Sequence, residues 1–285
     1  MQKFEVENHE YSLLPKDKKW KLIWSDEFDG DTLDESKWSY RLDFFGMPGE
    51  AWTDKGVELD GNSNVVFKPV IVDGKLCSSQ LQTGENSFDK LDIQGAIAKR
   101  LNKEHGDSPW GGDVDVWPVK PLNKAKFAHR YGYYEARVKF QKLPFWWSAF
   151  WTQSPTIGMS ANPEYAGVES DIIENFGDGK LIRGNLFNGY GKQFSHAGRL
   201  QNTYVEDGEY HRVGMYWGED GYVFYFDGVE SSRTSEPVSR VEQFILLTTE
   251  VQGYRKGNPK TTWTQEELDD RFICDYVRVF DEIKE

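Results

Sequence analysis

The stretch Tyr133-Tyr134-Glu135-Ala136-Arg137-Val138-Lys139-Phe140 shows the pattern that decides the fold class. Apolar and polar side chains alternate along it, as they do in a β-strand with one buried and one solvated face. Helical periodicity is nearly absent elsewhere. The exception is a short turn predicted over residues 264–268, where Thr264 precedes Glu267 by three positions as in a capping box. This pattern predicts an all-β fold.

Further short strands are predicted on both sides of this stretch, and turn signals separate them. Asp73-Gly74 and Asp227-Gly228 are two such signals, each typical of a tight hairpin. Many short strands joined by turns favour a β-sandwich or jelly roll. The other predicted strands are 21–24, 65–67, 70–72, 75–81, 149–151, 168–174, 212–217, 222–226, 244–249 and 275–280.

Length and charge limit the organisation of the chain and its partners. The 285 residues are compatible with a single β-sandwich domain, so we expect a polar N-terminal arm over 1–19 and one domain over 20–285. The formal net charge of -13 argues against general nucleic-acid binding, because an acidic chain repels phosphates. No apolar run approaches the roughly 20 residues that cross a bilayer. We expect no membrane span, and a monomer.

The cysteines and the first residues bear on the cellular compartment. Cys77 and Cys274 are too few for a disulfide framework or a thiolate zinc site. We expect two separate buried thiols, with one long-range disulfide as the alternative. The start, MQKFEVE, lacks the apolar stretch of a signal peptide. The chain is therefore either cytoplasmic or exported by means of a signal that this sequence does not contain.

A row of acidic residues stands out in the predicted strand GVESDIIEN, residues 167–175. Side chains alternate along a strand, so Glu169 and Asp171 point to the same face. Glu174 has the wrong parity for that face. One extra residue in a β-bulge at Ile172-Ile173 would bring it back. The sequence thus predicts three carboxyls in one row.

Such a row suggests chemistry, because neighbouring carboxyls cannot all ionise freely and the arrangement costs stability. A retaining glycoside hydrolase uses it, since its mechanism needs one ionised and one protonated carboxyl close together. The alternative is a solvated acidic strand edge. The apolar pair that follows Asp171 and the flanking aromatics are unlike such an edge.

Aromatic residues make up 15% of the chain, and several are expected to contact a carbohydrate. Trp147 and Trp151 fall on one face of a predicted strand, where indole rings could stack on sugars, while Trp146 falls on the opposite, core-facing side. The alternative for each is packing in the core. Tryptophans in predicted loops are further candidates for substrate contact: Trp52, Trp110 and Trp263.

The chain resembles glycoside hydrolase family 16, the group of laminarinases, lichenases, agarases, porphyranases and carrageenases. The resemblance implies a concanavalin-like β-jelly roll with a concave substrate cleft, and retaining endo-hydrolysis of a polysaccharide. It rests on motifs in the family's order, from Trp24-Ser25-Asp26-Glu27-Phe28 and Asp73-Gly74-Lys75-Leu76, through Gly132–Lys139 and Trp147-Ser148-Ala149-Phe150-Trp151, to Tyr210-His211, Phe226-Asp227-Gly228 and Asp275-Tyr276-Val277-Arg278-Val279.

The resemblance also implies roles for individual residues. Glu169 would be the nucleophile, Asp171 the assisting acid and Glu174 the acid/base, with Trp147 contacting the sugar near the cleaved bond. Asn188 and Glu250 lie where members place polar substrate contacts. Many members hold a structural calcium, for which Asp275 is the candidate ligand, and catalysis needs no cofactor. Family members suggest a secreted, periplasmic or cell-surface location.

Two departures from the family pattern leave the substrate open. Ser170 stands where members usually carry Ile, Leu or Val. Residues 247–253, LTTEVQG, replace an Asn-Leu-Ala-x-Gly-Gly stretch of laminarinases, which favours galactan-active branches over a plain laminarinase. Both β-glucans and red-algal galactans stay open as substrates. A non-catalytic lectin of jelly-roll type and a transglycosylase using the same acids are the competing functions.

Overall fold

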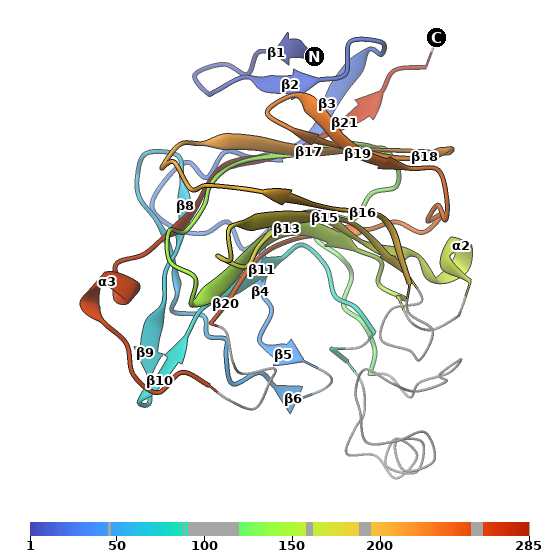
Figure 1. Cartoon of the computed structure of the whole chain (residues 1–285). Helices are drawn as coiled ribbons and strands as arrows, with labels where there is room; N and C mark the ends of the chain where they lie inside the picture. The colour runs from blue at the N-terminus through green and yellow to red at the C-terminus, as the bar shows by residue number, and fades with distance from the viewer. Residues whose placement is uncertain are drawn as a thin grey trace.

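The computed structural model describes residues 1–44, 47–87, 89–90, 120–157, 162–187, 195–251 and 259–284. Two antiparallel sheets form a sandwich, and Figure 1 shows them as two stacked layers. The seven-stranded sheet has the order β16 (Ser195–Thr203), β15 (Lys180–Phe187), β14 (Val168–Asn175), β13 (Trp146–Gln153), β20 (Phe244–Val251), β11 (Gln80–Gln82) and β4 (Ser39–Tyr40).

The eight-stranded sheet covers one face of the first. Its order is β19 (Val229–Thr234), β18 (Gly221–Phe226), β17 (His211–Gly218), β12 (Gly132–Lys139), β21 (Phe272–Glu282), β8 (Val65–Phe67) and β7 (Val57–Leu59), with β3 (Trp20–Asp26) also paired to β21. The remaining elements are β1 (Gln2–Phe4), β2 (Ser12–Leu14), β5 (Asp43–Phe44), β6 (Met47–Pro48), β9 (Val70–Val72), β10 (Lys75–Cys77), α2 (Pro163–Ala166) and α3 (Gln265–Leu268).

The core lies between the two sheets, and alternation along the strands fills it. On β12, Tyr134, Ala136 and Val138 are fully buried and belong to the main apolar cluster. Glu135 and Arg137 point the other way, as the alternating sequence predicts. The all-β sandwich is therefore confirmed, and it fits the jelly-roll architecture.

Tight turns join several strands where the sequence predicts them. Asp73 and Gly74 join β9 to β10, and Asp227 and Gly228 join β18 to β19. All four residues have positive φ, with Gly228 at 76°, a conformation that glycine adopts without strain. At the other end of the chain, the short helix α3 begins with the predicted capping box of Thr264 and Glu267.

Other elements differ from the prediction. The expected strand 75–81 is split into β10 and β11, because the chain leaves one sheet pairing and enters another at Ser78-Ser79. Strands β15, β16 and β19 were not expected, since polar residues and glycines hide their alternation. Cys77 and Cys274 are free buried thiols, as predicted.

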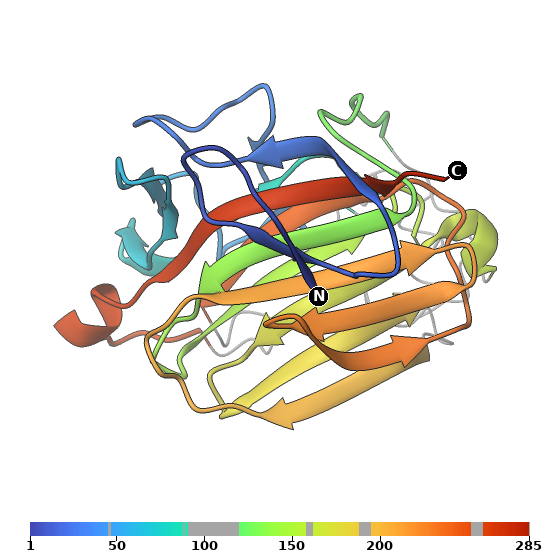
Figure 2. The same cartoon turned by 90° about the horizontal axis from the view of Figure 1, so that it is seen from above.

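The N-terminal arm is a docked hairpin. Strands β1 and β2 pair with each other and lie over the outer face of the eight-stranded sheet (Figure 2). Leu14 is fully buried there against Trp20, Tyr133 and Phe280. The expected polar arm thus contributes apolar side chains to a satellite core.

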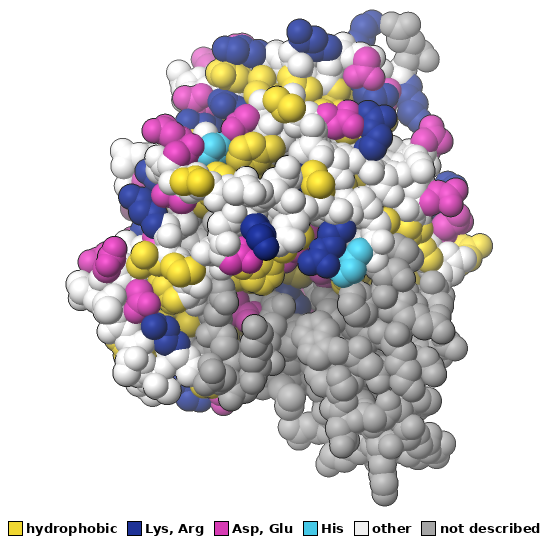
Figure 3. Space-filling model, viewed as in Figure 1, with side chains coloured by type: hydrophobic (Ala, Val, Ile, Leu, Met, Phe, Trp, Pro, Cys, Tyr) yellow, Lys and Arg dark blue, Asp and Glu magenta, His cyan; other side chains and the backbone are white. Residues whose placement is uncertain are grey.

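The surface carries mixed charge. On the face shown in Figure 3, acidic and basic side chains are interspersed, and the net charge of -13 does not gather into one patch there. Within the described residues, neither helix has the length and apolar character needed to cross a membrane.

Candidate active site

The three predicted carboxyls lie on one face of β14. In the pairing with β13, Glu169 is opposite Gln153, Asp171 opposite Trp151 and Glu174 opposite Ala149. Residues that pair directly across an antiparallel ladder share a face. All three carboxyls therefore lie on the outer face of the seven-stranded sheet, away from the core.

A β-bulge produces this arrangement. The register shifts between Asp171 and Glu174 against β15, and between Phe150 and Trp151 on β13. Ile172 and Ile173 are both buried in the core as a result. The predicted bulge at these two isoleucines is confirmed. The apolar pair drives it, because both side chains gain burial when the extra residue is absorbed.

The two outer carboxyls of the row have different hydrogen-bond partners. Trp147 donates from Nε1 to Glu174 Oε1 at 3.2 Å. Gln153 donates from Nε2 to Glu169 Oε2 at 2.6 Å. Each donor comes from the neighbouring strand β13, so the sheet itself holds the ends of the row apart and fixes how each carboxyl is aimed.

Two predicted tryptophans meet around one arginine beside this row. The guanidinium carbon of Arg41 lies 5.5 Å from the ring centre of Trp151 and 5.8 Å from that of Trp52. Both indoles are almost fully buried. Trp151 also donates from Nε1 to Thr248 Oγ1 at 2.9 Å. Both rings are thus fixed by packing next to the carboxyl row.

The structure places the other predicted substrate residues unevenly. Glu250 is buried on β20 directly opposite Trp147, and therefore faces the same side as the row. Trp263 is half-buried just before α3, and among the described residues no hydrogen bond or ring contact joins it to the row. Asn188 and Trp110 lie outside the described residues.

Comparison with known proteins gives the family. A sequence model of glycosyl hydrolases family 16 matches residues 117–265, just over half of the chain. The chain belongs to this family. It is 24% identical over 234 residues to a beta-1,3-glucan-binding protein of Penaeus monodon, covering 73% of this chain and 61% of that protein.

A second curated relative and a solved structure are also similar to the chain. The chain is 26% identical over 221 residues to glucan endo-1,3-beta-glucosidase A1 of Niallia circulans, covering 73% of this chain and 28% of that protein. It spans less than two thirds of the length of both curated relatives. The catalytic domain of a laminarinase from Thermotoga petrophila RKU-1 has the same fold, with a TM-score of 0.64, 22% identity and coverage of 94% of this chain and 100% of that chain.

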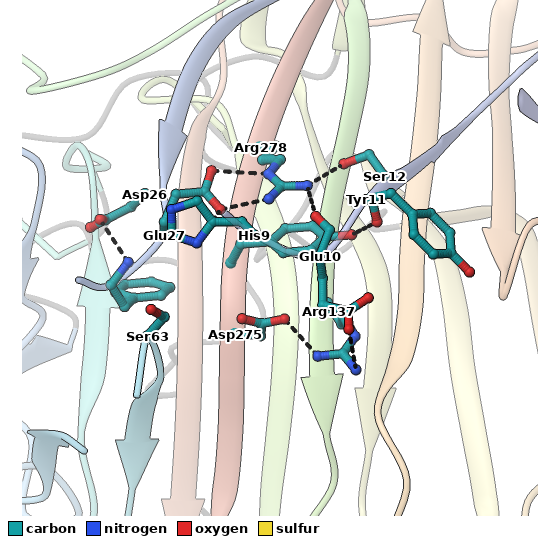
Figure 4. A network of polar contacts seen from close by, with 12 residues as sticks. His9, Glu10, Tyr11, Ser12, Asp26, Glu27, Ser63, Arg137, Asp275 and Arg278 are labelled. Carbon is teal, nitrogen blue, oxygen red and sulfur yellow. Dashed lines mark hydrogen bonds and ion pairs between the residues drawn. The ribbon is translucent and has the colours of Figure 1, made fainter. Parts of the chain in front are cut away.

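Asp275, the candidate calcium ligand, is paired with an arginine in this structure. Its Oδ2 atom accepts a hydrogen bond from Arg137 Nη1 at 2.6 Å (Figure 4). The nearby Glu27 carboxylate is taken up by Arg278, at 2.9 Å from Nε and 2.6 Å from Nη2. Guanidinium groups thus stand beside the acids that would ligate a cation. Within the described residues, no group of three or more His, Cys, Asp or Glu side chains could hold a metal.

Sequence reasoning missed Gln153, the polar residue that contacts Glu169. Gln153 has the same parity on its strand as Trp147 and Trp151, so the alternation that placed the two tryptophans could also have placed this amide on their face. For side chains that reach the site from distant segments of the sequence, strand alternation gives no such indication.

Proposed function

We propose that the chain is a retaining, endo-acting β-glycanase that hydrolyses a neutral β-glucan. One observation carries this proposal, namely the row formed by Glu169, Asp171 and Glu174 on the outer face of one strand. A retaining glycosidase needs two carboxyls with different roles on the two ends of such a row. Different donors on Glu169 and Glu174 support different roles.

The proposed mechanism has two steps. Glu174 gives its proton to the glycosidic oxygen while the Glu169 carboxylate attacks the anomeric carbon, so that the glycosidic bond breaks and a glycosyl ester forms. A water molecule then attacks the same carbon. Glu174 takes a proton from that water, and the Glu169 carboxylate leaves. Asp171, between them on the same face, helps keep Glu174 protonated and Glu169 oriented.

Charge favours a neutral substrate over a sulfated one. Glu250 shares the outer face with the three carboxyls, and the buried Arg41 is already paired with Asp89. A polyanion would therefore meet a negative centre at the row. The names of the two curated relatives, both of which refer to 1,3-linked glucan, also support β-1,3-glucan as the first substrate to test.

A glucan-binding protein without turnover is the second candidate function. The relative from Penaeus monodon is named as a binding protein, and it covers as much of this chain as the named glucosidase does. Such a function would use the aromatic side chains but would have no need of a nucleophile. Transglycosylation is a third outcome, because it uses the same acids with a sugar in place of water.

The deciding experiment is turnover on a polysaccharide panel. Purified protein is incubated with laminarin, lichenan, agarose and carrageenan, and new reducing ends and transfer products are measured. We expect laminarin to be cut internally with retention at the anomeric carbon, observed by proton NMR. Hydrolysis of agarose and not of laminarin would show that the substrate is a galactan.

Variants test the residue assignments. Glu169→Ser and Glu174→Gln are each expected to lose nearly all turnover, by at least about 10³-fold, while keeping the fold. Glu230→Gln is the matched control, because this carboxyl lies on β19 of the other sheet and pairs with Arg233. Full activity in either of the first two variants would contradict the mechanism. Binding of laminarin without turnover by the unmodified protein would favour the glucan-binding function.

A further inference from the structure

A continuous chain of buried polar side chains leads from Glu169 into the protein. Gln153 donates to Glu169, and its Oε1 atom accepts from Asn86 Nδ2 at 2.6 Å. Asn86 Nδ2 also donates to Asp89 Oδ2 at 3.1 Å. Arg41 closes the chain, with Nε 2.5 Å and Nη2 3.0 Å from the two oxygens of Asp89.

Burial fixes which group donates and which accepts in each hydrogen bond of this series. Arg41, Asn86, Asp89 and Gln153 are each at most 5% exposed. Water therefore offers little substitute for a lost partner, and an unmet donor or acceptor is costly. The four residues come from three separate segments of the chain, so the sandwich fold alone brings them together.

The Arg41 guanidinium sets the donor and acceptor roles of the whole series. A guanidinium only donates, and an ionised carboxylate only accepts, so Asp89 takes up the Arg41 hydrogens. Asn86 must then turn its NH₂ group to Asp89, which agrees with its Oδ1 accepting from the Asp89 backbone N–H at 2.7 Å. The same NH₂ group faces Gln153 Oε1. The remaining end of Gln153, its own NH₂ group, is thereby directed at Glu169.

We propose that Arg41, Asp89, Asn86 and Gln153 form a positioning relay that keeps a donor hydrogen aimed at Glu169. The inference deepens the proposed function, because it assigns a means of orienting the nucleophile. The relay holds the carboxylate in one rotamer and favours its ionised form, since a hydrogen bond to the charged state stabilises that state. It also stabilises the carboxylate as it leaves in the second step.

Other titratable groups share the outer face and act on Glu169 as well. These groups are Asp171 and Glu174 on β14, Glu250 on β20 and, on β16, His196, which pairs with Leu186 of β15. The two on the same strand as Glu169 are acids, and they oppose its ionisation. The hydrogen bond that Gln153 donates from β13 offsets this effect at Glu169, the carboxyl that has to be ionised in order to attack.

The test is a direct titration of the Glu169 carboxyl. Protein with ¹³C-labelled glutamate is titrated by NMR, and the Glu169 signal is identified by its loss in Glu169→Gln. In Gln153→Met, which keeps the length of the side chain without the amide, the midpoint is expected to move to higher pH by about one unit. On laminarin, kcat should fall at least about tenfold with little change in KM.

A second variant tests the relay beyond Gln153. Asn86→Leu keeps the approximate shape and adds no charge but removes the amide, so no donor fixes the Gln153 oxygen and either end of the Gln153 amide can face Glu169. The midpoint is expected to rise as in Gln153→Met. Thr152→Val is the matched control, because this neighbour on β13 loses one buried hydrogen bond, to Gln243, on the opposite face. It should leave the midpoint unchanged.

The outcomes separate the relay from the enzyme assignment. An unchanged midpoint in folded Gln153→Met would overturn the relay. If the midpoint shifts in Gln153→Met but not in folded Asn86→Leu, the hydrogen bond from Gln153 acts alone and the relay from Arg41 is overturned. The titration needs no turnover, so it judges the relay even where the unmodified protein fails to cut any polysaccharide. That failure would count against the proposed function alone.

Discussion

Two neighbouring tryptophans on β13 make the same kind of hydrogen bond on opposite faces of one strand. Trp147 donates to Glu174 on the outer face, and Trp146 donates to Asp270 Oδ2 at 3.0 Å in the core. Alternation separates them, as the sequence predicts. A residue of identical type therefore serves two different purposes one position apart, and the pair offers an internal control for the site.

At the residue scale, Trp147→Phe should weaken catalysis with little effect on the fold. The ring can still pack against Phe176, whose centre lies 6.0 Å away, but the donor to Glu174 is lost. Glu174 becomes a carboxylate as it gives up its proton, and a hydrogen bond to a charged group is worth about 1.5–3 kcal/mol, so kcat/KM on laminarin should fall at least about tenfold. Steady-state kinetics measures this.

Trp146→Phe is the control for that prediction. Its indole donor faces the buried Asp270, which also accepts from the backbone N–H groups of Lys142 and Leu143. Loss of this donor should lower the free energy of unfolding by about 1–3 kcal/mol while leaving kcat/KM nearly unchanged. Equal losses of activity in both variants would show that Trp147 acts only through packing.

At the element scale, strict alternation of side chains along β14 could not bury both isoleucines and also keep all three carboxyls on the outer face. The two isoleucines require burial, and the three carboxyls require the outer face. The bulge satisfies both, and the sequence contains the whole reason for it. The inner face of the same strand is less well matched, because Ser170 Oγ is fully buried without a hydrogen-bond partner, opposite Asn185, whose side-chain amide is likewise unpartnered.

Ser170→Val is therefore expected to stabilise the protein. The change removes an unsatisfied hydroxyl and buries two methyl groups in the sandwich core, which should raise the free energy of unfolding by about 1 kcal/mol. Urea unfolding followed by tryptophan fluorescence measures it. Ser170→Ala, which removes the hydroxyl without adding volume, should gain less. A clear loss of stability in Ser170→Ala would mean that the hydroxyl binds a buried water.

At the scale of the whole molecule, the N-terminal arm covers a buried acid on the sheet opposite the site. Glu135 is 1% exposed and accepts from the Leu13 backbone N–H, 3.1 Å from Oε2, and from the Tyr276 hydroxyl, 2.8 Å from Oε1. Burial raises the pKa of Glu135 to about 7, although these hydrogen bonds and Arg212 act in the opposite direction.

The stability of the protein should therefore fall as pH rises between about 4.5 and 7. In that window the unfolded chain has lost the Glu135 proton while the folded protein still holds it, so each rise in pH favours unfolding. The contribution of this one group is about 3 kcal/mol, fully present below the lower value and absent above the higher one. Unfolding in urea across the pH range measures the slope.

Glu135→Gln isolates this contribution. An amide does not titrate, so the free energy of unfolding should change less with pH over this window. Between pH 4.5 and pH 8, the variant should therefore lose less stability than the unmodified protein does. Glu230→Gln is the control, since that carboxyl is exposed and has its pKa lowered by Arg233. An unchanged slope in Glu135→Gln would show that the proton is not held in the folded state.

The sequence by itself determined the strand-rich sandwich, the hairpin turns, the capped turn at α3 and the carboxyl row with its bulge. Each of these depends on side chains a few positions apart, where the period of a strand or the chemistry of a turn sets the outcome. Strands β15, β16 and β19 escaped prediction because their polar residues and glycines blur that period.

Only the tertiary structure decided which distant residues complete the site. Arg41 and Asp89 are connected to Glu169 through Asn86 and Gln153, and Arg137 pairs with Asp275, the candidate calcium ligand. Both results depend on segments that the two sheets bring together. Periodicity gives the face on which a side chain lies, but it does not give the partner that packing places against it.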